Sequence, residues 1–118
     1  CYCVHMFILY ENMYKDELYY QDIFKCNCKN ILGEEYELYD KKDLQRKRPD
    51  AWVIKNGKEV IPVEMKLRIF NQSALNQLLN YMDMYECKSG IAIGNSLSVE
   101  LPLNIMFINI SKVKEYDG

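Results

Sequence analysis

The spacing of hydrophobic positions near the start of the chain predicts an α-helix. Between residues 7 and 25, apolar side chains recur three to four positions apart, which is typical of a helix with one buried face. Asn27, Asn30 and Gly33 follow this stretch and are typical of a helix end. The expected apolar face is formed by Phe7, Tyr14 and Leu18, flanked by Met6, Tyr10, Met13, Tyr20 and Phe24.

The middle of the chain predicts a β-hairpin. Residues 51–55, AWVIK, lead into Asn56-Gly57, two residues that readily take the positive φ angles of a type I′ turn. The run EVIPVEMKL, residues 59–67, is the expected return strand. Pro62 lies within it and cannot donate a hydrogen bond to a neighbouring strand, which indicates an edge position, a bulge or a late start to pairing.

The remaining segments predict a sheet between helices. A second helix is expected over residues 72–86, capped by Asn71 or Ser73. Its apolar positions are Leu75, Leu78, Leu79, Met82 and Tyr85. Further short strands are expected at residues 34–40, 89–95 and 101–110. This order predicts an α/β sandwich with a mixed sheet, in a single domain spanning residues 1–118.

Composition narrows the class of protein. The chain is 49% hydrophobic and 27% charged, which is ordinary for a globular protein, and no run approaches the roughly 20 apolar residues of a membrane helix. The opening CYCVHMFILY lacks a basic leader and a small-residue cleavage site, so we do not interpret it as a signal peptide. We expect an intracellular, cytoplasmic protein without membrane association, with a nuclear or viral setting left open.

Charge and cysteine content point to two further expectations. The net charge is −2, yet residues 41–48, KKDLQRKR, hold five basic residues against one acid, so this basic strip either contacts phosphates or is a solvated loop. Its cations are Lys41, Lys42, Arg46, Lys47 and Arg48.

Five cysteines, an odd number, argue against a disulfide framework. The pairs Cys1/Cys3 and Cys26/Cys28 are spaced too closely for an ordinary zinc site, and we expect reduced, partly buried thiols.

Three charged residues occupy the predicted hairpin. Glu64 and Lys66 are two residues apart, so both side chains leave one face of the return strand. Asp50 begins the partner strand, and the tight turn can bring it near Glu64. Two converging carboxylates repel unless a cation lies between them, and Mg²⁺ needs only one or two carboxylates with waters. The alternative is a surface hairpin with an ordinary cross-strand ion pair.

The order of motifs resembles the signature of the PD-(D/E)xK nuclease superfamily. Pro49-Asp50 precedes the hairpin turn and Glu64-Met65-Lys66 follows it. On the next predicted helix, Gln77 and Tyr81 share one face and match the Q-x-x-x-Y motif of the RecB-type exonuclease branch. The resemblance spans roughly residues 48–85 and implies a restriction-endonuclease-like core, with a central mixed sheet flanked by helices.

The resemblance also implies roles for individual residues. Asp50, Glu64 and the backbone carbonyl of Met65 would bind Mg²⁺ or Mn²⁺, and Lys66 would be the catalytic lysine. Family members usually add a glutamate from the first helix and often a histidine ligand near the N-terminus. Gln77 and Tyr81 would position the DNA backbone or the lysine. The helix glutamate would be Glu17, with Glu11 as its alternative, and the histidine would be His5, whose alternative is simple packing.

These observations predict a Mg²⁺-dependent deoxyribonuclease, with endonuclease and exonuclease activity both open. DNA is the expected partner and RNA is a second possibility. A homodimer or a partner subunit would supply further DNA-binding surface, because one small domain covers little duplex. The alternative function is a catalytically inactive nuclease-fold module that binds nucleic acid or a protein partner.

Overall fold

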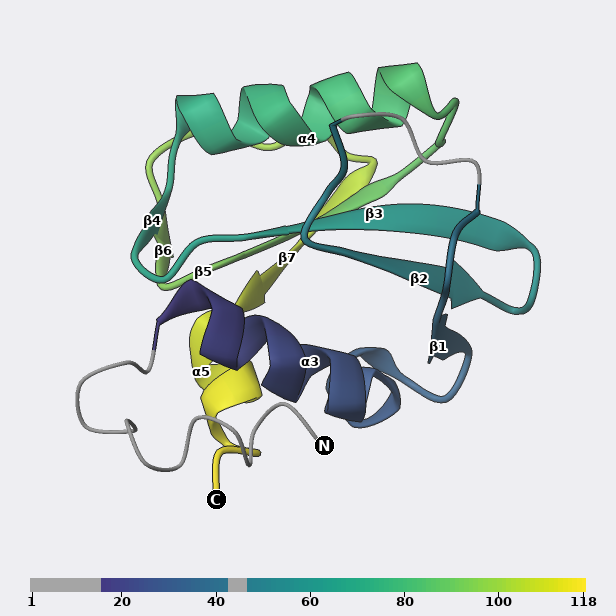
Figure 1. Cartoon of the computed structure of the whole chain (residues 1–118). Coiled ribbons are helices and arrows are strands. Elements are labelled where there is room, and N and C mark those ends of the chain that lie inside the picture. The colour runs from purple at the N-terminus through teal and green to yellow at the C-terminus, as the bar shows by residue number, and fades with distance from the viewer. Residues whose placement is uncertain (1–15, 43–46) are drawn as a thin grey trace.

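The fold is a mixed β-sheet with helices on both faces. The computed structural model describes residues 16–42 and 47–118 (Figure 1). Its helices are α3 (Glu17–Leu32), α4 (Gln72–Met84) and α5 (Ile110–Lys114). Its strands are β1 (Tyr36–Leu38), β2 (Ala51–Lys55), β3 (Glu59–Met65), β4 (Ile69–Phe70), β5 (Gly90–Gly94), β6 (Ser96–Leu97) and β7 (Ile105–Asn109).

The central sheet combines antiparallel and parallel pairing. Its five strands lie in the order β1-β2-β3-β5-β7, with β1, β2 and β3 antiparallel and β3, β5 and β7 parallel. The short strands β4 and β6 form a separate parallel pair. Helix α4 lies across one face of the sheet, and α3 and α5 lie across the other (Figure 1). The predicted α/β arrangement with a mixed sheet is therefore confirmed.

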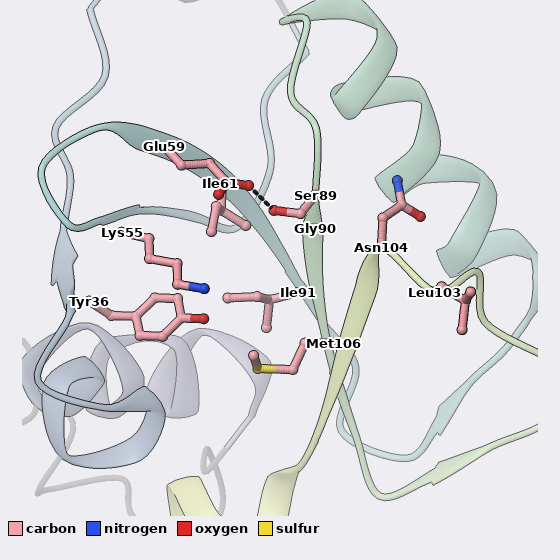
Figure 2. A pocket seen from close by; sticks show the side chains of 10 residues that line it. All are labelled: Tyr36, Lys55, Glu59, Ile61, Ser89, Gly90, Ile91, Leu103, Asn104 and Met106. Atoms are coloured by element: carbon pink, nitrogen blue, oxygen red, sulfur yellow. Dashed lines mark hydrogen bonds between the residues drawn. The ribbon is translucent and has the colours of Figure 1, made fainter.

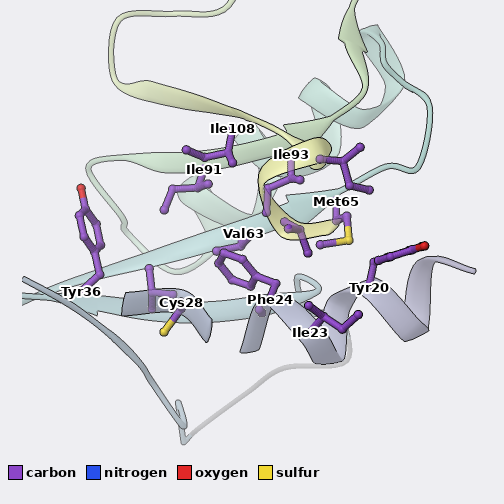
Figure 3. Close-up of a cluster of buried hydrophobic side chains, with 14 of the residues drawn as sticks. Tyr20, Ile23, Phe24, Cys28, Tyr36, Val63, Met65, Ile91, Ile93 and Ile108 are labelled. Atoms are coloured by element: carbon purple, nitrogen blue, oxygen red, sulfur yellow. The ribbon is translucent and has the colours of Figure 1, made fainter. Parts of the chain in front are cut away.

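Alternating residues of β3 separate the two sides of the sheet. Ile61, Val63 and Met65 are buried in the larger apolar cluster, which lies between the sheet and α3 with α5 (Figure 3). That cluster includes Tyr20, Ile23, Phe24 and Cys28 of α3 and Ile110 and Val113 of α5. Because side chains alternate along a strand, Pro62 and Glu64 point to the opposite side, toward α4. A buried acid therefore falls on the α4 side of a strand whose α3 side is apolar from Ile61 to Met65.

The second helix follows its sequence pattern closely. Asn71 is its N-cap, and its side chain accepts a hydrogen bond of 3.0 Å from the backbone N–H of Ala74. Of the predicted apolar positions, Leu75, Leu78 and Met82 are buried, whereas Leu79 is exposed. The buried side of α4 packs against a second apolar cluster that includes Phe70, Ala92 and Ile105. This anchoring presents the other side of the helix, including Gln77, to solvent.

The first helix differs from its prediction. Asp16 has extended backbone angles and caps α3, so the helix described begins at Glu17. It continues past residue 25 to Leu32, and Gly33, one of the predicted end signals, is its C-cap. Leu18, expected on the buried face, is 52% exposed, whereas Tyr20 and Phe24, expected at the flanks of that face, are buried together with Tyr19 and Ile23. The predicted face is therefore wrong at Leu18, because packing against the sheet decides which side of α3 is buried. Residues 7–15 lie outside the described residues.

The hairpin has the predicted turn. Asn56 and Gly57 have φ angles of 54° and 65°, and the backbone N–H of Lys58 donates to the carbonyl of Lys55 at 3.0 Å. Pro62 pairs with Trp52 on the β2 side, but pairing with β5 begins only at Val63. The missing donor of the proline therefore precedes the parallel ladder, which matches a late start to pairing.

The described cysteines include both free and disulfide-bonded residues. Cys28 and Cys87 are free, but Cys26 is disulfide-bonded, so the expectation of reduced thiols is wrong at Cys26. Cys1 and Cys3 lie outside the described residues.

In the part of the chain that the structure describes, no helix combines the length and the apolar character needed to cross a membrane.

Candidate functional site

Asp50 lies where β2 begins and is tied directly to the end of β3. Its backbone N–H donates to the carbonyl of Val63 at 3.1 Å, and its Oδ2 accepts a hydrogen bond of 2.7 Å from the N–H of Met65. The side chain thus takes the place of a backbone acceptor just before β2 begins, beyond the last residue pair of β2 and β3. This bond fixes the Asp50 carboxylate beside the Glu64-Met65 peptide.

Glu64 is the most unusual charged residue in the described chain. It is only 4% exposed, and its Oε1 is buried without a hydrogen-bond partner. Its Oε2 lies 3.8 Å from the Nζ of Lys66, a long ion pair. Burial and the nearby carboxylate of Asp50 raise the pKa of Glu64 to about 8, although the charge of Lys66 opposes this rise. A buried carboxyl with an unpartnered oxygen is costly for the fold.

Glu17 and Tyr81 face the same group of charges. Burial raises the pKa of Glu17, with Lys66 lowering and Asp50 raising it. Burial also raises the pKa of the Tyr81 phenol, and the charges of Glu64 and Asp50 add to this. The first turn of α3 and the last turns of α4 therefore each direct an ionisable group toward the hairpin. The Asp50 carboxyl has its pKa raised by burial as well, against the Met65 N–H, Lys66 and Lys25.

The predicted Q-x-x-x-Y pair lies beside this cluster. Gln77 and Tyr81 line a hollow of about 360 Å³ together with Lys47, Arg48 and Asn80. Two cations of the basic strip thus meet the polar side of α4. Asn80 lies between the two motif residues on the exposed side of α4, and the sequence reasoning missed it because no motif singles it out.

Other members of the basic strip lie elsewhere. Lys42 pairs with Asp40 at 2.7 Å on the surface. The Nζ of Lys41 is 5.6 Å from the centroid of the Trp52 ring and 5.4 Å from that of Tyr85. Arg46, Glu11 and His5 are not among residues 16–42 and 47–118, so their predicted roles are not described.

The residue that follows α4 contacts Lys47 of the basic strip. Tyr85 donates its hydroxyl hydrogen to the carbonyl of Lys47 at 2.7 Å, and its ring meets Trp52 edge to face with centroids 5.0 Å apart. Sequence reasoning treated Tyr85 only as an apolar helix position. Its spacing of four from Tyr81 is the signal that places both rings on the side of α4 that faces the hairpin.

A second hollow lies at the opposite end of the sheet. It has a volume of about 270 Å³ and an apolar floor that includes Ile61, Ile91 and Met106 (Figure 2). Lys55, which ends β2, and Glu59, which begins β3, stand at its polar side, and the hydroxyl of Ser89 donates to Glu59. The two ends of the hairpin therefore each carry a lysine and a glutamate.

The donor set of the first site suits a hard divalent cation. No three histidine, cysteine or acidic side chains among the described residues are grouped so as to hold a metal ion. Mg²⁺, however, takes one or two protein carboxylates and completes its shell with waters. A cation at this position would give the unpartnered Oε1 of Glu64 a partner and would offset the rise in the pKa of Glu64 that the Asp50 carboxylate contributes. The residues present therefore fit Mg²⁺ or Mn²⁺.

Comparisons with known proteins do not add to this description. No family model, no curated protein and no solved structure matches the chain.

Proposed function

We propose that this protein is a metal-dependent nuclease that hydrolyses phosphodiester bonds in DNA, with a restriction-endonuclease-like core. The observation that carries the proposal is the convergence of Asp50, Glu64 and Lys66, with an oxygen of Glu64 buried and unpartnered. A fold gains nothing from such a group, whereas costly, pKa-shifted clusters are typical of functional sites.

The cation has a defined role in this proposal. Asp50, Glu64 and the carbonyl of Met65 would hold Mg²⁺ or Mn²⁺, which would supply Lewis-acid polarisation of the phosphodiester and a lowered pKa of water. The Asp50 carboxylate is already oriented for this by its 2.7 Å bond from the Met65 N–H. A cation beside the unpartnered oxygen of Glu64 would also favour the ionised carboxylate, which the metal-free protein disfavours.

Lys66 would act on the phosphate through its charge. Its Nζ is 3.8 Å from Glu64, and its side chain is about one-third exposed, so the ammonium reaches both the buried carboxylate and the surface. There it would donate hydrogen bonds to the phosphodiester oxygens, where negative charge grows as the bond to phosphorus forms. It would also orient the attacking water.

The polar side of α4 would hold the substrate backbone. Lys47, Arg48, Gln77 and Tyr81 share one hollow, and such side chains commonly bind phosphate and sugar oxygens. Because the pKa of Tyr81 is raised, its phenol stays protonated and remains a donor. The alternating layers of helix and mixed sheet are compatible with the proposed core.

Cleavage of plasmid and single-stranded DNA with Mg²⁺ or Mn²⁺ tests the proposal. We expect Lys66→Ala to lower the rate about a thousandfold, the scale of removing a group that stabilises developing charge. Lys55→Ala is the matched control, because Lys55 lies at the turn end of the same β2–β3 hairpin. This variant should cleave DNA at the wild-type rate. DNA that stays intact with either metal, or equal rates for both variants, would contradict the proposal; binding without cleavage would favour the inactive module.

A further inference from the structure

A further hollow, the hollow beside Asp50, borders the candidate site. The inference drawn from it deepens the proposed function, on which it rests. The hollow has a volume of about 400 Å³, and Asp50 forms part of its wall. Three cations line it: Lys25 from α3, and Lys41 and Arg48 from the connection between β1 and β2. Cations brought together from two separate parts of the chain form a positive surface.

These cations are not used up by neighbouring acids. Among the described residues, neither Lys25 nor Arg48 takes part in an ion pair. Of the two acids in the wall, Asp40 is paired with Lys42 at 2.7 Å. The other acid is Asp50, which lines the hollow together with Lys25, so the ammonium lies beside the candidate site. The positive charges of the hollow are therefore available to bind an added anion.

The side chain of Lys41 is ordered before an anion binds. Lys41 lies over the rings of Trp52 and Tyr85, at 5.6 and 5.4 Å from their centroids. A lysine ordered by aromatic rings loses less side-chain entropy when it meets an anion. Tyr39, which is half-buried, adds an aromatic surface to the same wall.

Arg48 connects the two hollows. It lines the hollow beside Asp50 and also the hollow formed with Gln77 and Tyr81. We propose that the hollow beside Asp50 binds the backbone phosphate of the nucleotide next to the cleaved bond, so that the strand passes Arg48 and is held on both sides of the cut. The hollow is large enough for a phosphate and part of its sugar.

The binding test uses a cleavage-deficient protein. In a Lys66→Ala background, a fluorescently labelled single-stranded DNA is titrated at several NaCl concentrations and followed by anisotropy. We expect Lys25→Gln to weaken binding about fivefold and to reduce the slope of log affinity against log salt by about 0.7, the value for one lost phosphate contact on a single strand. Lys25→Arg should restore both quantities.

A matched control separates local from overall charge. Lys58→Gln makes the same change of charge in the turn at the far end of the hairpin and should leave affinity and slope unchanged. Wild-type affinity and slope for Lys25→Gln, or an equal loss for Lys58→Gln, would overturn the inference while leaving the cleavage result for Lys66→Ala intact. A parent protein that binds no DNA would overturn both the inference and the proposed function.

Discussion

The two ends of the β2–β3 hairpin carry similar charges in opposite circumstances. At the turn end, Glu59 accepts a hydrogen bond from Ser89, and Lys55 lies over the ring of Tyr36 at 5.6 Å. At the open end, Glu64 is buried with one oxygen unpartnered and a pKa of about 8. Glu59, whose carboxylate has a hydrogen-bond partner, and Glu64, which has an oxygen without one, are thus only five positions apart on one strand.

The difference shows which of the two ends requires an explanation beyond stability. An acid at a half-exposed strand end with a hydroxyl partner contributes to the fold or is neutral, as Glu59 is expected to be. A buried acid beside a second carboxylate weakens the fold whenever it is charged. Under the proposed function, Glu64 marks the open end as the part of the hairpin that would bind a cation, and the following predictions test this contrast.

The largest expected effect is on stability without metal. The pKa of Glu64 rises from 4.5 to about 8 on folding, so the folded state binds the extra proton between these values. The stability from this group is therefore full below about pH 4.5 and is lost as pH rises through about 8. Glu64→Gln should remove this loss and raise the unfolding free energy at about pH 9, in EDTA, by on the order of 3 kcal/mol.

Glu59→Gln is the control for that measurement. An amide can still accept the hydrogen bond from Ser89, so this variant should change the unfolding free energy by less than about 1 kcal/mol. Chemical denaturation across the pH range measures both variants. Equal effects of the two substitutions, or a Glu64→Gln protein that is less stable than wild type in alkaline buffer, would remove the contrast between the two ends.

The next effect is on metal binding. A cation held by Asp50 and Glu64 binds only the folded state, and it should stabilise wild type by about 2.7 kcal/mol when Mn²⁺ is present at a hundred times its dissociation constant. Because bound metal favours the ionised Glu64, the fall in stability toward alkaline pH should also shrink. Thermal unfolding with and without Mn²⁺ measures both effects.

Asp50→Asn and Glu59→Gln complete the metal experiment. The first removes a charged ligand but keeps an acceptor for the Met65 N–H, so it should fold and lose most of the Mn²⁺ response. The second changes the opposite end of the hairpin and should keep the response of wild type. A similar Mn²⁺ shift in Asp50→Asn would place the cation elsewhere.

Local signals explain what could be predicted of the fold. The Asn56-Gly57 turn, the Asn71 cap and the spacing of Leu75, Leu78 and Met82 depend on neighbours within a few residues, and each is found as expected. The hairpin then brings Asp50 toward Glu64, as its geometry requires. Strands β4 and β6 and helix α5 were missed because two to five residues are too few to show a period.

Long-range packing explains what could not be predicted. Leu18 is exposed because α3 turns Tyr19, Tyr20, Ile23 and Phe24 into the main apolar cluster, and the apolar spacing alone did not separate these positions from Leu18. The approach of Lys25 to Asp50 depends on how α3 crosses the sheet, which no local pattern contains. The motif residues and the cations of the basic strip could therefore be selected from the sequence, whereas the position of Lys25 beside them could not.

The smallest predicted effect compares two tyrosines at the two ends of the sheet. Tyr81 faces the carboxylates, whereas Tyr36 lines the hollow at the turn end (Figure 2). Tyr81→Phe removes a donor toward the substrate and should lower the cleavage rate about tenfold, near 1.4 kcal/mol, with little change in stability. Tyr36→Phe should cleave like wild type. If both variants lose activity equally in a plasmid-cleavage assay, the hydroxyl of Tyr81 has no local role, and the open end depends on its charges alone.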